Sequence, residues 1–181
     1  MNKLTLNKSV LYIIAILILF IVPIYTIIIN SDTLKDGTEY LFRVEAFDPY
    51  DMFRGNYLNI SFEEDTVNGN IKEAEKNYYS GEYYVTIGTK RDGFAYFKEI
   101  SESKPQNTSN YFKTTGYYSK YANEYRIDTP TRYYMNEEKS LTAEKTYRDN
   151  IDSTYVKVRV KNGKMVIVGV YVNDVLIDTI D

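Results

Sequence analysis

The first hydrophobic feature of the chain is a run of twenty uncharged, mostly apolar residues from Val10 to Ile29. At about 1.5 Å per residue, a helix of this length spans the roughly 30 Å hydrocarbon core of a bilayer. Every face of that helix is apolar, so the pattern predicts a membrane span and not a buried core helix. A cleaved signal peptide has a shorter apolar region that ends in small residues. This run ends in Thr26-Ile27-Ile28-Ile29, which favours an uncleaved signal anchor.

Beyond residue 38, apolar and polar positions alternate, a pattern typical of half-buried strands. We predict strands at 39–47, 56–62, 83–87, 94–100, 111–118, 125–127, 132–135, 155–160, 165–172 and 175–177. Asn162-Gly163, between two of them, is the strongest two-residue hairpin signal in the chain.

Short helices are predicted at 71–77 and 136–149, the second with Leu141, Ala143 and Tyr147 as its apolar contacts. The expected fold class is therefore α+β and mostly β. One N-terminal transmembrane helix precedes a single antiparallel β-rich domain that carries one or two short helices.

The flanks of the apolar run predict its orientation. Lys3 and Lys8 precede the run without any acid, whereas Asp32 is the first charge after it. The positive-inside rule then places the N-terminus in the cytoplasm and the domain outside, in a single-pass protein of the cell membrane. We expect a cytoplasmic stub at 1–9, a transmembrane anchor at 10–29, a polar linker at 30–38 and an extracytoplasmic domain at 39–181.

The net charge of the region beyond the apolar run argues against nucleic acid as a partner. The whole chain has 22 basic and 25 acidic side chains, and residues 1–30 hold two lysines and no acids, so the remainder has a net charge of −5. Such a domain is a poor candidate for nucleic acid, because phosphate binding needs concentrated positive charge. The remaining length suits one domain.

The chain has no Cys and no His. It therefore has no disulfide, thiolate nucleophile, histidine-ligated metal or Ser-His-Asp triad, and no cofactor is predicted. Paired carboxylates at Asp48 and Asp51, or at 63–65, could serve acid–base chemistry, but capping and solvated charge explain them better. Of the 20 tyrosines, 18 fall outside the apolar run. They would form either an aromatic platform for ligands or half-buried strand positions, and the latter is favoured.

One segment combines several local signals. Asp48 fits a helix N-cap, Pro49 the first helical position and Gly55 a left-handed residue that ends a turn. Arg54 can pair with Asp51, three residues earlier. These residues predict a structural turn. If the turn is instead a binding site, its contacts are Arg54 and Tyr57, with Asp51 beside them.

The stretch from Asp48 to Phe62 resembles the signature of the GDYxxLxY-domain proteins, a bacterial family named for Gly-Asp-Tyr-x-x-Leu-x-Tyr. Gly55 and Tyr57 match that signature, whereas Asn56, Ile60 and Phe62 replace its Asp, Leu and final Tyr. The family's upstream residues are also present, at Asp48, Pro49, Asp51 and Arg54. Because the replacements preserve shape, we assign Asp48, Pro49, Gly55, Asn56, Ile60 and Phe62 to a structural motif.

The resemblance implies a membrane-anchored accessory protein whose partner is a multi-pass membrane protein, and it implies no established activity. We therefore expect a non-enzymatic protein whose outer domain binds another envelope protein. Two alternatives stay open. One is a module that binds a cell-wall glycan or peptide, and the other is a His-independent hydrolase of Ser–Lys or dual-carboxylate type.

The predicted orientation can be tested with a reporter fused after Asp181. We expect a reporter that is active only outside the cytoplasm to be active there, because the lysines at the N-terminus hold that end inside. The same fusion made with a cytoplasm-specific reporter is the control. Activity of the cytoplasm-specific reporter alone would reverse the orientation.

Overall fold

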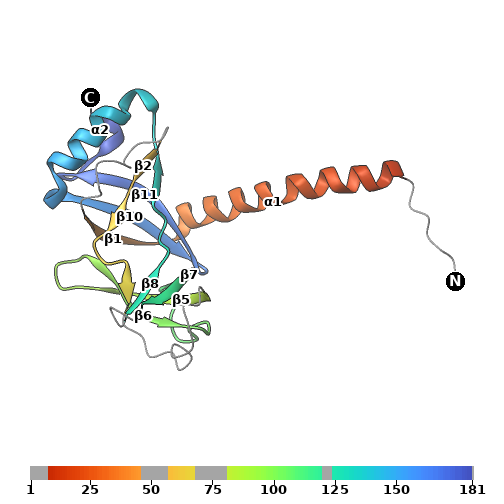
Figure 1. Ribbon diagram of the computed structural model, residues 1–181, viewed down its shortest axis with the longest axis horizontal. Coiled ribbons are helices and arrows are strands. Elements are labelled where there is room, and N and C mark those ends of the chain that lie inside the picture. Colours follow the sequence, from red (N-terminus) through yellow and green to blue (C-terminus); the bar gives the residue numbers. More distant parts are fainter. Residues whose placement is uncertain (1–7, 46–56, 68–80, 120–123, 181) are drawn as a thin grey trace.

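The computed structural model describes residues 8–45, 57–67, 81–119 and 124–180. A long helix, α1 (Lys8–Asp36), projects from a β-rich domain that also carries a shorter helix, α2 (Glu137–Asp149) (Figure 1). Of the helices described, α1 alone is long and apolar enough to cross a membrane, and its apolar window is not buried by the domain. This fits a single-pass membrane anchor, and a signal sequence would have the same form.

The described part of the domain contains three antiparallel sheets. The first has the order β12-β11-β10-β1-β3, the second pairs β2 with β9, and the third has the order β4-β8-β7-β5-β6. Their strands are β1 (Thr38–Glu45), β2 (Tyr57–Asn59), β3 (Ser61–Phe62), β4 (Thr66–Val67), β5 (Gly81–Thr89), β6 (Ala95–Ser101), β7 (Tyr111–Ser119), β8 (Glu124–Ile127), β9 (Arg132–Tyr134), β10 (Thr154–Lys161), β11 (Lys164–Val172) and β12 (Val175–Leu176). Two 3₁₀ turns follow α2 and β12 in the chain, η2 (Ile151–Ser153) and η3 (Ile177–Thr179).

The predicted class is confirmed: the described chain is mostly β, with antiparallel sheets and one N-terminal apolar helix. The hairpin at Asn162-Gly163 has φ of 51° and 81° at its two residues, both in the left-handed region that such a tight turn needs. The helix predicted at 71–77 and the turn predicted at 48–55 lie outside the described residues.

Four phenylalanines join the first and third sheets. Phe42 of β1 lies 4.9 Å from Phe97 of β6 and 5.3 Å from Phe62 of β3, measured between ring centroids. Phe97 in turn lies 5.5 Å from Phe112 of β7. All four rings are buried, and tilted or edge-on contacts of this kind add to the energy of burial. The two sheets therefore share one hydrophobic core.

Two predictions fail in the structure. Leu141 is 75% exposed, whereas Ala143 and Tyr147 are buried as predicted. At about 100° per residue, position 141 lies some 200° around the helix from position 143, so the two cannot face the same core. The strand predicted at 56–62 is divided at Ile60, because its first half pairs with β9 and its second half with β1.

The segment expected as a polar linker, 30–38, is mostly helical. α1 continues to Asp36, Gly37 makes the bend, and β1 begins at Thr38. Side chains of β10 hold the last helical turn in place. Arg159 donates to the carbonyl oxygens of Leu34 and Lys35, and Lys161 Nζ lies 2.7 Å from Asp32 and 3.3 Å from Asp36. The hydrogen bonds from Arg159 satisfy carbonyl groups at the end of the helix. The sequence of residues 30–38 does not reveal this extension of the helix, because its partners lie on β10.

Gly37 makes this junction sensitive to substitution. A Cβ at residue 37 would clash with the carbonyl oxygen of Thr33 and lie 3.0 Å from Arg159 Cβ. We therefore expect Gly37→Ala to lower the free energy of unfolding by about 1–3 kcal/mol, as overpacked sites do. Thermal melting of the full chain in detergent micelles measures this loss. The exposed change Leu141→Ala is the control, expected within about 0.5 kcal/mol of the parent. Equal melting temperatures for the two variants would contradict the proposed clash.

Candidate functional site

The structure describes only the second half of the signature segment. Tyr57, Ile60 and Phe62 are placed, whereas Asp48, Pro49, Asp51, Arg54, Gly55 and Asn56 lie outside the described residues. Tyr57 is therefore the one candidate binding contact whose surroundings can be stated.

Tyr57 is the less exposed ring of an aromatic pair. It is half-buried on β2, opposite Tyr134 of β9, and the two ring centroids are 5.7 Å apart. The Arg132 guanidinium lies 5.1 Å from the centroid of the Tyr57 ring, in cation–π range. Tyr134 is 67% exposed. This arrangement leaves Tyr57 available at the surface, in agreement with either a structural or a binding role.

The strand that follows Tyr57 has a buried and an outer side. Leu58, Ile60 and Phe62 are at most 1% exposed, as the alternation predicts. On the outer side, Ser61 Oγ donates to a Glu45 carboxylate oxygen at 2.9 Å. Ile60 and Phe62 thus pack into the core, where their apolar character is needed.

An open notch lies beside this strand. The segments 57–67 and 125–134 run antiparallel and pair at both ends, β2 with β9 and β4 with β8. The hydrogen bonds nearest the middle join Ile60 N–H to Thr131 C=O at 2.7 Å and Ile127 N–H to Asp65 C=O at 3.0 Å. Between these two hydrogen bonds the segments separate, and the space has a volume of about 440 Å³. It is lined by Asn59, Ile60, Ser61, Phe62 and Asp65 on one side and by Tyr117, Arg126, Ile127, Asp128, Thr129 and Thr131 on the other.

Contacts with the neighbouring strand explain why the two segments separate. Asp128 is held by β7: its N–H donates to Thr115 C=O at 2.9 Å, and the hydroxyls of Thr114 and Thr115 donate to its carbonyl and carboxylate oxygens. Pro130 then fixes φ near −65°, far from the roughly −140° of an antiparallel strand. The chain from 128 to 130 therefore bends away from the signature strand.

The notch has an apolar base and a polar rim. Ile60, Phe62 and Ile127 are buried beneath it, whereas Tyr117, on the strand next to Arg126, is 39% exposed. Arg126 Nε lies 3.6 Å from Asp65, in a pair that is largely exposed and therefore weak. With Asp128, the charged lining residues sum to one negative charge.

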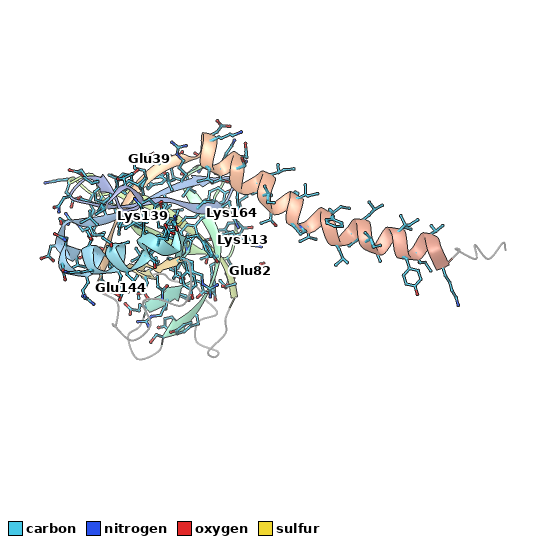
Figure 2. The ribbon with its side chains drawn as sticks, turned by 90° about the horizontal axis from the view of Figure 1, so that it is seen from above. Glu39, Glu82, Lys113, Lys139, Glu144 and Lys164 are labelled. Atoms are coloured by element: carbon cyan, nitrogen blue, oxygen red, sulfur yellow. The ribbon has the colours of Figure 1, made fainter. Side chains whose placement is uncertain are left out.

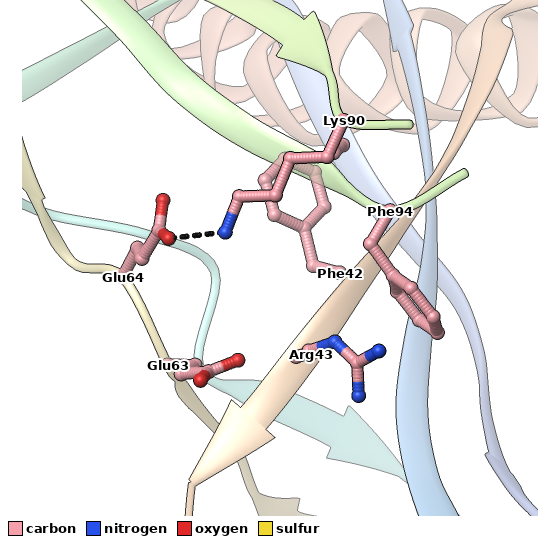
Figure 3. Close-up of a pocket in the computed structure, with 7 residues that line it drawn as sticks. Phe42, Arg43, Glu63, Glu64, Lys90 and Phe94 are labelled. Atoms are coloured by element: carbon pink, nitrogen blue, oxygen red, sulfur yellow. Dashed lines mark hydrogen bonds and ion pairs between the residues drawn. The ribbon is translucent and has the colours of Figure 1, made fainter. Parts of the chain in front are cut away.

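The three successive carboxylates 63–65 do not form a catalytic pair. Asp65 faces Arg126, whereas Glu64 lies 2.5 Å from Lys90 on the other side, and this partner raises the pKa of Lys90 (Figure 3). The cavity beside Lys90 and Arg43 has a volume of about 10 Å³, roughly the space of one water molecule. Arg43 closes its rim by stacking 4.1 Å from the centroid of the Phe94 ring. This cluster stabilises the junction of strands and offers no ligand site.

Evidence for the other chemistries is weak in the described part of the chain. No group of three or more Asp or Glu side chains there is placed to hold a metal ion. The hydroxyls of Ser61, Ser101 and Ser153 bond to a carboxylate, to Ser103 and to a backbone carbonyl, and none of these partners is a lysine amine.

The sequence did not indicate most of the residues that line the notch. Tyr117, Arg126, Asp128 and Thr129 were not singled out, because only the tertiary pairing of 57–67 with 125–134 brings them to the signature strand. The one local signal was Thr129-Pro130, a dipeptide that interrupts strands.

The fold and the notch define a class: a β-rich domain on an apolar N-terminal helix, with its signature strand at the edge of an open notch. A family model described as GDYXXLXY protein matches residues 19–170. The chain therefore belongs to the GDYXXLXY protein family, and the predicted resemblance is confirmed. Comparison with curated proteins and with solved structures finds no match.

Two tyrosines behind the signature strand predict a pH dependence of stability. Burial raises the pKa of Tyr133 above its ordinary value of 10.0, and its hydrogen bond of 2.6 Å to Asp178 adds to the shift. Burial also raises the pKa of Tyr147, with a further contribution from Glu45. Unfolded tyrosines lose their protons near pH 10, whereas these two keep theirs while folded. Stability should therefore fall as pH rises above about 10.

We expect the double variant Tyr133→Phe/Tyr147→Phe to flatten this fall, measured as melting temperature between pH 9 and pH 11. Tyr134→Phe, a change at an exposed ring, is the matched control and should keep the parent slope. A double variant with the parent slope would show that other groups cause the dependence.

Proposed function

We propose that this protein is a single-pass, membrane-anchored binding protein that holds a segment of another envelope protein in the notch beside its signature strand. The observation that carries the proposal is the notch itself. Four consecutive residues of the signature segment, 59–62, form one of its sides, and its volume of about 440 Å³ exceeds the roughly 350 Å³ of the pocket beside Glu99. A family signature that serves only the core would not need to border an open surface.

The helix–domain junction supports a partner in the same membrane. Arg159 and Lys161 bind the end of α1, so the domain is attached without a flexible linker. Figure 2 places Lys113 and Lys164 near the base of α1 and Glu144 of α2 farther from it. The domain would then sit close to the bilayer at a constant height, which suits a partner that is itself embedded there.

The orientation belongs to the same proposal. Lys3 and Lys8 precede the apolar run without any acid, whereas Lys35 follows it between Asp32 and Asp36, and this asymmetry favours a cytoplasmic N-terminus and an extracytoplasmic domain. An uncleaved anchor fits the continuous packing of the last helical turn against β10, because Thr33 of that turn is only 1% exposed.

A glycan module is less well supported. Among the described residues five tyrosines are buried, so part of the tyrosine content serves packing and not a surface platform: Tyr40, Tyr83, Tyr111, Tyr125 and Tyr147. The notch offers one partly exposed aromatic ring, Tyr117, and sugar platforms depend on exposed rings.

Site-specific photocrosslinking in native membranes tests the proposal. A photoreactive amino acid at Thr129, on the rim of the notch, should yield one integral membrane protein repeatedly. The same amino acid at Thr142, on the exposed face of α2, is the matched control and should not yield that protein. Mass spectrometry of the crosslinked products makes the comparison.

Two results would contradict the proposal. Identical products from positions 129 and 142 would mean that the notch is not the contact surface. Crosslinks from position 129 to cell-wall glycan, without any protein, would favour the glycan module instead.

A further inference from the structure

The domain extends along the side of α1 as far as the end of the uncharged run. The residues from Val10 to Ile28 are exposed, whereas Ile29 and Asn30 are half-buried and Thr33 is only 1% exposed. β10 and β11 contact this end of the helix. Because the uncharged run fills the roughly 30 Å hydrocarbon core of a bilayer, the part of the domain beside Ile29 would lie where that core ends.

The tip of the β10–β11 hairpin lies at about the same level. Lys161 Nζ is 2.7 Å from a carboxylate oxygen of Asp32, a residue about 4.5 Å beyond Ile29 along the helix axis. Lys164 is the cross-strand partner of Lys161, so the two side chains leave the same face of the hairpin. The headgroup layer extends about 5–7 Å beyond the hydrocarbon core. Both lysines therefore reach this layer when α1 spans a bilayer.

A third lysine stands beside the hairpin tip. Lys113 N–H donates to Gly163 C=O at 2.7 Å, and Figure 2 shows Lys113 and Lys164 on the side of the domain from which α1 projects. Lys113 Nζ lies 2.8 Å from Glu82, and Lys161 is likewise paired, with two carboxylates of α1. These two lysines are therefore already neutralised by the protein.

Lys35 and Lys164 are the lysines that remain at the base of α1. Both are exposed, and neither forms an ion pair in the described part of the chain. Side chains of a helix lean toward its N-terminus, which for Lys35 is the direction of the bilayer, and the long lysine stem can reach the headgroup layer. The region beyond residue 30 has a net charge of −5, so two unpaired cations on this side stand out from the rest of the domain.

We infer that Lys35 and Lys164 bind the phosphate groups of anionic phospholipids in the leaflet that the domain faces. This inference rests on the proposed function, because it requires α1 to stay in the bilayer. Ammonium groups form charge-assisted hydrogen bonds with phosphate oxygens. A headgroup that carries its own cation, such as phosphatidylcholine, would repel the lysines, so an anionic headgroup such as phosphatidylglycerol is favoured. Near an anionic surface each lysine is worth about fivefold in affinity.

The first experiment measures where the two lysines lie. The full chain, labelled with ¹⁵N-lysine, is placed in nanodiscs of about four parts phosphatidylcholine to one of phosphatidylglycerol, with a trace of lipid that carries a nitroxide on its headgroup. We expect strong relaxation enhancement at the backbone amides of Lys35 and Lys164. The amide of Lys145 is the control, because α2 lies away from α1 (Figure 1) and should be little affected. Equal enhancement at Lys145 and Lys164 would overturn the inference.

The second experiment measures the choice of lipid. Native mass spectrometry of chain released from the same nanodiscs gives the ratio of bound phosphatidylglycerol to bound phosphatidylcholine. We expect the parent to exceed the ratio in the disc by about fivefold or more, and Lys35→Gln/Lys164→Gln to fall to within about twofold of it. The matched control Lys145→Gln/Arg148→Gln, which removes two charges from α2, should keep the parent ratio. Melting temperatures verify that both variants fold.

The outcomes separate this inference from the proposed function. A parent without lipid preference, or a preference that Lys35→Gln/Lys164→Gln keeps, would overturn lipid binding. If position 129 still crosslinks to a membrane protein in that case, the proposed function stands. Loss of the chain from the nanodiscs would contradict the membrane anchor itself, and both proposals with it.

Discussion

Arg159 and Lys161 of β10 bind the last turn of the apolar helix, and the placement of the whole domain depends on this contact. The final carbonyls of a helix have no partner within it, and cations are favoured at that end. Arg159 donates hydrogen bonds to the carbonyl oxygens of Leu34 and Lys35, and Lys161 forms ion pairs with Asp32 and Asp36. Because β10 is also the central strand of the first sheet, the helix is attached to a strand that is paired on both sides.

The notch follows from a competition between two partners for one segment. Residues 125–134 pair with the segment 57–67 at both ends, but Asp128 forms its hydrogen bonds with the hydroxyls and backbone of β7 instead. Three hydrogen bonds to one residue outweigh the continuation of a ladder that Pro130 already disfavours. A hydrophobic core shared by two sheets lies beneath, so the opening at the surface does not disturb the packing of Phe42, Phe62 and Phe97.

The sequence predicted the elements better than their arrangement. Alternation located the strands, and the Asn162-Gly163 turn identified the closing hairpin, because both signals are local. Leu141 was assigned to the core on apolar character alone, although helical periodicity separates it from Ala143 and Tyr147. The helical continuation to Asp36 and the notch could not be predicted, because each depends on residues that lie far away in the sequence: Arg159 for the first, and Asp128 with Thr115 for the second. The signature residues 48–56 remain predictions.

The bend at Gly37 also limits where a partner can be met. A domain on a flexible linker searches a hemisphere above the membrane, and its local concentration falls as the linker lengthens. Here the chain passes from helix to strand within one residue. In the proposed membrane-anchored form, the notch would move only by lateral diffusion of the anchor and by rotation about the axis of α1, so its search would be confined to a thin layer parallel to the bilayer. A partner would have to present its segment within that layer. The length of the loop that carries the segment would therefore help to determine which partners can bind.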